Sequence, residues 1–272
     1  MRDFTTDTLR LLLSSFQSTG YPYVTVAGYL HNPSSPAVIL RHDIDSRPGN
    51  ALFCAQMEAG MGISGTYYFR TVPGSFNETV IRQIGKLGHE VGYHYEDLAV
   101  AKGSREEAIT RFAENLAKLR RLAPVETICM HGSPLSKFDN RLLWEKYDYR
   151  EFGIIGEPYL DIGFDKVCYI TDTGRCWDGD RFSLRDKVKS GNQLTYPGQA
   201  VSAGGIRQQS DLSLHTTFDI MKALEANLMP PVILMTIHPQ RWNNGFISWI
   251  TELVFQNSKN VVKGLFNRSA RH

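Results

Sequence analysis

The chain has 272 residues, of which 42% are hydrophobic and 11% aromatic, enough for a real core and unlike a disordered protein. Its formal net charge of +2 is too small to indicate binding to nucleic acid or to an anionic membrane. The chain has no run of 18 apolar residues, so no membrane span is predicted, and residues 1–7 do not resemble a signal peptide. The four cysteines have no C-x-x-C or disulfide-framework spacing, which favours reduced thiols in a cytoplasmic protein.

The first 36 residues form a predicted lead-in. Apolar residues at helical spacing indicate an amphipathic helix over 4–18 that ends near Gly20. A short strand over 23–26 and a polar loop over 31–36 are expected next. No linker separates this lead-in from the rest, so we expect it to pack on the main domain.

The four apolar residues before R-H-D-I-D at 41–45 predict a strand that is buried on both faces. Asp43 and Asp45 then point the same way, because residues i and i+2 share one side of an extended chain. Two carboxylates this close are costly unless a cation or a shared proton offsets them. The simpler alternative is that Asp45 caps the next helix and Asp43 pairs with Arg41 or Arg47.

Strands and helices alternate along the rest of the chain. Strands are predicted over 64–70, 90–94, 127–131, 151–155, 166–171 and 232–238, and helices over 48–60, 78–87, 105–119, 139–147, 217–228 and 245–255. The alternation predicts a parallel sheet of about seven strands, either open or closed into a barrel. No G-x-G-x-x-G directly follows the strand that ends at R-H-D-I-D, and no G-x-x-x-x-G-K-[ST] occurs in the chain, which argues against nucleotide binding. Residues 172–231 contain one clear helix and predict a loop-rich insertion over the site.

Several predicted strands end in residues suited to metal chemistry. Asp43 and Asp45 end the first strand, and three other strands end at His94, His131 and His238. Ligand sites of parallel α/β folds lie at the carboxyl ends of the strands. One such histidine alone is more typical of a structural role. Together with the two aspartates, the three predict a zinc-type site with an open coordination position.

Four short segments resemble motifs of the NodB-homology polysaccharide deacetylases, carbohydrate esterase family 4. R-H-D-I-D at 41–45 is similar to the first motif in its D-x-D variant, and G-H-E-V-G-Y-H at 88–94 is similar to the second. H-G-S-P at 131–134 lies where the family has its third motif, and T-I-H-P at 236–239 resembles the fifth.

Two further segments, T-D-T-G-R-C-W at 171–177 and R-D-K-V at 185–188, resemble the WbmS-like branch of these deacetylases. That branch is associated with bacterial surface-polysaccharide loci. The resemblance covers nearly the whole chain. It implies an α/β fold, a distorted (β/α)7 barrel, with a single domain over 1–272 and a helical lead-in.

The resemblance also implies roles for individual residues. Asp43 is expected to be the general base, His238 the general acid, and Asp45 and His94 metal ligands. The family's second motif usually supplies another histidine four residues after the first, but this chain has Leu98 there. We therefore expect His131 to be the third ligand, with Asp97 as the alternative. The expected metal is zinc, with cobalt or nickel as alternatives.

The implied reaction is hydrolysis of an N-acetyl group on a carbohydrate. Because no signal peptide is expected, the predicted substrate is a cytosolic precursor of a surface polysaccharide. Residues that are candidates for orienting the substrate, each with ordinary ion pairing or core packing as the alternative, are Arg41, Asp172, Arg175, Trp177 and Trp242. Two other functions remain open: a metal-free C–N hydrolase that acts on a non-sugar amide, and a non-catalytic carbohydrate-binding protein.

Overall fold

A computed structural model describes residues 1–133, 136–177, 188–190, 193–195 and 214–269. The chain divides into two compact units. The Asp43 unit contains residues 24–34 and 39–162, and the His238 unit contains residues 1–23, 35–38 and 163–272. The expectation of a single domain stays a prediction.

Parallel strands form the sheet of the Asp43 unit. Its members are β2 (Ala37–Ile44), β3 (Thr66–Phe69), β4 (Glu90–Tyr95) and β5 (Ile128–Met130). Arg41 lies opposite Thr66, Thr66 opposite Glu90, and Tyr93 opposite Ile128. Every residue of β2 is buried, which confirms the strand expected from its apolar run. Because the strands are parallel, their carboxyl ends meet at one edge.

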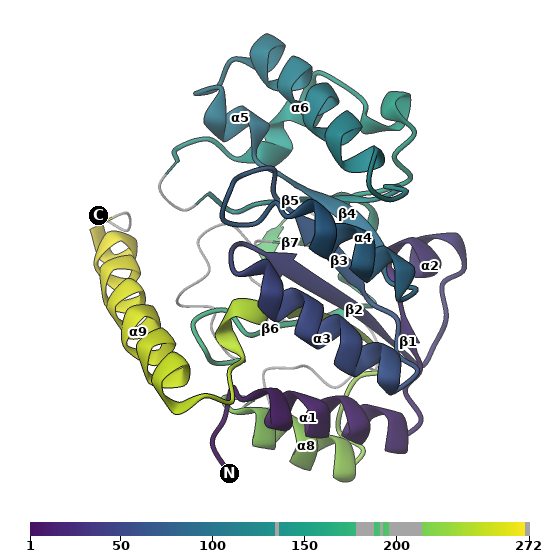
Figure 1. Ribbon diagram of the computed structural model, residues 1–272, viewed down its shortest axis with the longest axis vertical. Coiled ribbons are helices and arrows are strands. Elements are labelled where there is room, and N and C mark those ends of the chain that lie inside the picture. The colour runs from purple at the N-terminus through teal and green to yellow at the C-terminus, as the bar shows by residue number, and fades with distance from the viewer. Residues whose placement is uncertain (134–135, 178–187, 191–192, 196–213, 270–272) are drawn as a thin grey trace. The chain divides into compact units, whose positions relative to one another are not determined.

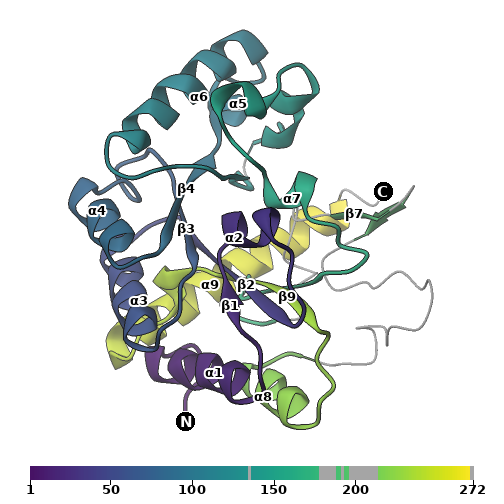
Figure 2. The same cartoon turned by 90° about the vertical axis from the view of Figure 1, so that its right-hand side faces the viewer.

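The Asp43 unit also contains helices, and those that lie between two of these strands in the chain connect them, as parallel pairing requires. They are α2 (Val26–His31), α3 (Pro48–Gly60), α4 (Glu78–Lys86), α5 (Asp97–Val100), α6 (Arg105–Arg120) and α7 (Pro158–Asp161), with 3-10 helices η1 (Asn140–Glu145) and η2 (Tyr149–Phe152). Helices α3 and α4 lie side by side on one face of the strands (Figures 1 and 2). Helices α4 and α6 begin close to their predicted starts at 78 and 105, and each has a side-chain cap: Asn77 accepts a hydrogen bond from the Val80 amide, and Ser104 from the Glu107 amide. Helix α3 begins after Arg47, whose side chain makes no capping hydrogen bond, and a capping role for Asp45 stays a prediction.

The His238 unit contains a second parallel pair, β6 (Cys168–Thr171) with β9 (Val232–Ile237). Helices α1 (Thr6–Ser18) and α8 (Thr217–Glu225) pack against each other (Figures 1 and 2). Its remaining elements are the antiparallel pair β7 (Val188–Ser190) and β8 (Gln193–Thr195), the 3-10 helix η5 (Pro239–Arg241) and α9 (Phe246–Ser269). The α/β class with parallel strands is confirmed and is compatible with a distorted barrel, whose closure stays a prediction.

Several expected elements were wrong. The strand expected over 151–155 is absent, because η2 occupies Tyr149–Phe152 and Gly153 follows it with a positive φ of 67°. The strand expected over 23–26 is limited to β1 (Tyr23–Val24), and α2 follows it directly. Much of the predicted insertion, 178–187 and 196–213, lies outside the described residues. Within the described part of the chain, no helix is both long and apolar enough to cross a membrane.

Candidate functional site

The end of β2 holds a buried ion pair. Asp43 Oδ1 accepts a hydrogen bond from Arg41 Nε at 2.8 Å, and Asp43 Oδ2 accepts one from Arg41 Nη2 at 2.6 Å. The two residues lie on the same side of the strand, as i, i+2 spacing dictates. The Arg41 guanidinium also lies 4.9 Å from the centre of the Tyr159 ring. Arg41 is therefore fixed by its neighbours and forms an ion pair with Asp43. This is the Arg41–Asp43 pairing expected from the sequence as the simpler alternative.

His94 presents one ring nitrogen to both aspartates. Its Nδ1 lies 3.0 Å from the Cys129 carbonyl oxygen and donates to it. Its Nε2 therefore carries the lone pair, and it lies 3.7 Å from Asp43 Oδ2 and 3.7 Å from Asp45 Oδ1. Burial lowers the pKa of His94 to about 4, more than the two carboxylates raise it. A neutral imidazole whose lone pair faces carboxylates is the form that binds a metal.

His131 is arranged in the same way by a different partner. Its Nε2 lies 3.5 Å from Asp45 Oδ1, and its Nδ1 lies 2.9 Å from Glu96 Oε2. Glu96 also receives two hydrogen bonds from Arg70 Nη2 and one from Arg70 Nε. Burial would raise the pKa of Glu96, but His131 and Arg70 lower it to about 2. The carboxylate is thus ionised and accepts the Nδ1 proton of His131.

These distances fit a metal ion. Ligand atoms at about 2.1 Å from a tetrahedral zinc are about 3.4 Å from one another. The separations of 3.5–3.7 Å from Asp45 and Asp43 to the two imidazoles are close to that value. Oxygen and imidazole donors suit zinc, cobalt or nickel. The pairs Asp45–His94 and Asp45–His131 are therefore each spaced as two ligands of one ion would be.

Two further side chains, Asp97 and Cys129, bear on which residues could hold an ion. Asp97, the alternative third ligand, accepts from Tyr93 Oη at 2.7 Å and from Asn115 Nδ2 at 2.9 Å, so both of its oxygens are used within the core. Cys129 offers a sulfur within 4.8 Å of donor atoms of Asp43 and His94, and the three form a buried group that could hold a metal. The hydrogen bonds of Asp97 make it the weaker alternative to His131, the third ligand stays a prediction, and Cys129 joins Asp43 and His94 as a possible donor.

The predicted acid, His238, lies at the end of β9 in the His238 unit. Its Nδ1 lies 2.7 Å from Asp172 Oδ1, and its backbone amide donates to Asp172 Oδ2. Arg241 Nη1 lies 2.6 Å from the same Oδ1 and 2.9 Å from the histidine Nδ1. Asp172 Oδ1 lies closer to Nδ1 than Arg241 Nη1 does, which favours a proton on Nδ1. Burial would raise the pKa of Asp172, but Arg241 and His238 lower it to about 2.

The residues expected to orient a substrate are buried in the folded chain, as Arg41 already is. Trp242 is 1% exposed and donates to Asp172, and Trp177 is 4% exposed and donates to Thr217 Oγ1. Arg175 lies between the rings of Phe4 and Trp249, at 5.1 and 5.0 Å from their centres. These side chains therefore contact their neighbours in the folded chain, and their role in orienting a substrate stays a prediction.

Glu96 was missed, although it follows the second motif by only two residues. Its signal was its place just after β4, the strand that carries His94. Cys129 was missed because a cysteine inside an apolar run resembles a core residue, yet it precedes His131 by two and shares its side of the extended chain. The contact between Glu96 and His131 joins residues far apart in the chain, and a single sequence does not reveal such contacts.

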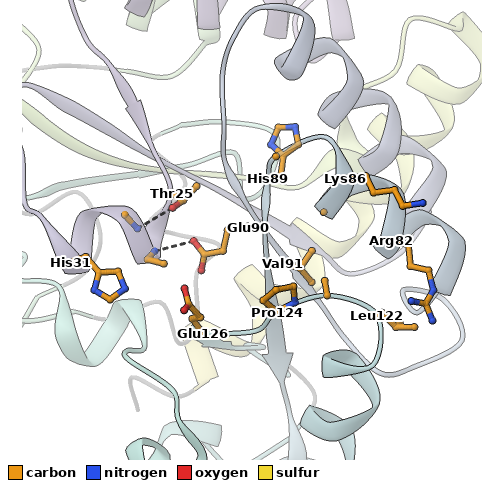
Figure 3. A pocket seen from close by; sticks show the side chains of 15 residues that line it. Thr25, His31, Arg82, Lys86, His89, Glu90, Val91, Leu122, Pro124 and Glu126 are labelled. Carbon is orange, nitrogen blue, oxygen red and sulfur yellow. Dashed lines mark hydrogen bonds between the residues drawn. The ribbon is translucent and has the colours of Figure 1, made fainter.

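A pocket of about 710 Å³ lies elsewhere in the Asp43 unit. It is lined at the amino end of β4 by Glu90, His89 and residues of α2, α4 and the segment before β5. Figure 3 shows Glu90 reaching the start of α2, where it accepts from the Ala27 amide. His94 lies near the other end of the same strand, so this pocket and the candidate metal residues are separate.

Searches of known protein-family models, of curated proteins and of solved structures found no match to this chain. The function is therefore inferred from the residues and from the geometry above.

Proposed function

We propose that the protein is a metal-dependent hydrolase that removes an N-acetyl group from a carbohydrate. The observation that carries this proposal is the convergence of Asp43, Asp45, His94 and His131 at the carboxyl ends of β2, β4 and β5. Both imidazoles use Nδ1 for an internal hydrogen bond and present Nε2 to carboxylate oxygens. That arrangement suits metal binding better than it suits an ordinary hydrogen-bond network.

Asp45, His94 and His131 would hold the ion, with Cys129 as an additional donor. When bound, a divalent ion such as zinc supplies Lewis acidity to the acyl oxygen and lowers the pKa of water. Asp43 would take the proton from the attacking water, and the Arg41 charge beside it favours its ionised form.

The second proton transfer is assigned to His238. The leaving amine needs a proton, and an imidazole is the side chain best suited to supply one near neutral pH. Asp172 fixes the ring orientation through Nδ1, so the proton that His238 would give in its imidazolium form is the one on Nε2. Arg241 and Trp242 hold Asp172 and thereby act through it.

The substrate class comes from the resemblance to polysaccharide deacetylases, and we propose a precursor of a surface polysaccharide in the cytoplasm. A metal-free amide hydrolase is the second candidate, and it is favoured by Leu98 at the position where the family has a metal ligand. The Arg41–Asp43 pair would serve either enzyme.

Metal content and acetate release test the proposal together. Wild-type protein is expected to bind about one ion per chain and to release acetate from N-acetylhexosamine substrates. Asp45→Asn, His94→Ala and His131→Ala should lose the ion, whereas Asp97→Asn and the exposed-histidine control His31→Ala should keep it. Asp43→Asn should keep metal and lose turnover. Wild-type protein that takes up neither zinc, cobalt nor nickel would overturn the metal mechanism.

A further inference from the structure

The third candidate ligand depends on a side chain that the catalytic scheme does not use. His94 and His131 both need an acceptor at Nδ1 so that Nε2 keeps its lone pair. For His94 that acceptor is the Cys129 backbone carbonyl, which no substitution of a side chain removes. For His131 it is the carboxylate of Glu96, at 2.9 Å.

Glu96 is itself held in place. Arg70, which follows β3, binds both of its oxygens, with Nη2 at 2.7 Å from Oε1 and 2.8 Å from Oε2. The side chains of Arg70 and Glu96 are 19% and 13% exposed, so solvent screens the pair only in part. Arg70, Glu96 and His131 follow three adjacent strands, β3, β4 and β5. The sheet register thus places a guanidinium, a carboxylate and an imidazole in a row.

Two groups compete with Glu96 for the ring of His131. Asp45 Oδ1 lies 3.5 Å from Nε2 and attracts a proton to that nitrogen. The Ser133 hydroxyl lies 3.1 Å from Nδ1 and can donate to it when Nδ1 carries no proton. Both contacts favour the tautomer with Nε2–H, which cannot bind a metal. The shorter, charge-assisted bond to Glu96 favours Nδ1–H instead.

We propose that Glu96, anchored by Arg70, is a positioning residue that fixes His131 in the Nδ1–H tautomer and thereby makes it the third metal ligand. This inference rests on the proposed metal-dependent function. Glu96 touches no reacting atom and acts only through His131.

The test is the zinc dissociation constant, measured by competition with a chromogenic chelator. Glu96→Gln is expected to weaken zinc binding by about 10- to 100-fold, the usual cost of losing the partner of a metal-bound histidine. Glu106→Gln is the matched control, since Glu106 forms an exposed ion pair with Lys146. The control should stay within about twofold of wild type. Equal affinity of Glu96→Gln and wild type would overturn the proposal.

A double-mutant cycle separates positioning from a general structural effect. In a His131→Ala background, Glu96→Gln should have no further effect on zinc affinity, whereas a full additional loss would show that Glu96 acts elsewhere. Nitrogen NMR of the metal-free protein reports the tautomer directly. We expect Nδ1–H at His131 in wild type and a shift toward Nε2–H in Glu96→Gln. Wild type with Nε2–H would refute the role of Glu96 even if zinc binds, and wild type with Nδ1–H but no zinc binding would refute only the proposed function.

Discussion

Replacing Arg41 by methionine tests the buried ion pair at the end of β2. The side chains of Arg41 and Asp43 are 1% and 6% exposed, and two hydrogen bonds of 2.6 and 2.8 Å join them. Methionine keeps much of the packing against Tyr159 but leaves Asp43 as a buried charge without its guanidinium. Breaking a buried pair in this way costs about 3–5 kcal/mol. For a chain of this size each kcal/mol lowers Tm by about 2 °C, so a decrease of roughly 8 °C is expected.

Urea unfolding of metal-free protein measures the loss directly. Arg105→Met is the matched control, because Arg105 forms an exposed pair with Glu145 that is worth at most about 1 kcal/mol. The double variant Arg41→Met/Asp43→Asn removes both charges and should recover at least half of the lost stability. A single Arg41 variant within about 1 kcal/mol of wild type, or a double variant less stable than the single one, would refute the argument.

Three other measurements follow from the site. The pKa of His94 is lowered to about 4 from 6.5, so the unfolded chain takes up a proton at higher pH than the folded chain does. The unfolding free energy of metal-free protein should therefore fall by up to about 3 kcal/mol as pH drops from 6.5 to 4. His94→Gln should remove that pH dependence. Asp172→Asn should cost about 3 kcal/mol in urea unfolding at pH 7, and because the pKa of Asp172 is lowered to about 2, the stabilisation it supplies in wild type should disappear as pH falls from about 4 to 2. Cys129→Ser should keep bound zinc if the two histidines and Asp45 hold it, and a loss of zinc would make the thiolate a ligand.

The positions of the site residues could be predicted because they depend on local rules. A buried apolar run followed by D-x-D ends a strand, and parallel strands bring their carboxyl ends to one edge. This placed His94 and His131 beside Asp45, as the structure shows. Hydrogen-bond partners were beyond the same reasoning, because Glu96 and His131 are 35 residues apart and only the register of β4 and β5 brings them together.

The elements of the fold could be predicted where a helix begins at a capping residue. The prediction failed where a turn determined the local structure. Asn77 and Ser104 cap α4 and α6, and both helices begin where the sequence predicted. Thr25 caps α2 in the same way, but the strand-forming residues around it suggested an extended segment. Around 151–155, local β propensity was overridden by the turn at Gly153, and only an isolated bridge from Thr127 to Gly156 remains.

The distances around Asp45 also bear on the choice between a metal-dependent and a metal-free enzyme. In a metal-free site, an imidazole would be stabilised by a direct charge-assisted hydrogen bond to a carboxylate, at a distance near about 2.8 Å. The protein forms such contacts nearby, at 2.9 Å between His131 and Glu96 and at 2.7 Å between His238 and Asp172. The Nε2 atoms of His94 and His131 instead stay 3.5–3.7 Å from Asp43 and Asp45. Separations beyond hydrogen-bond length, with both Nδ1 atoms already bonded, are compatible with the shared ion that we propose.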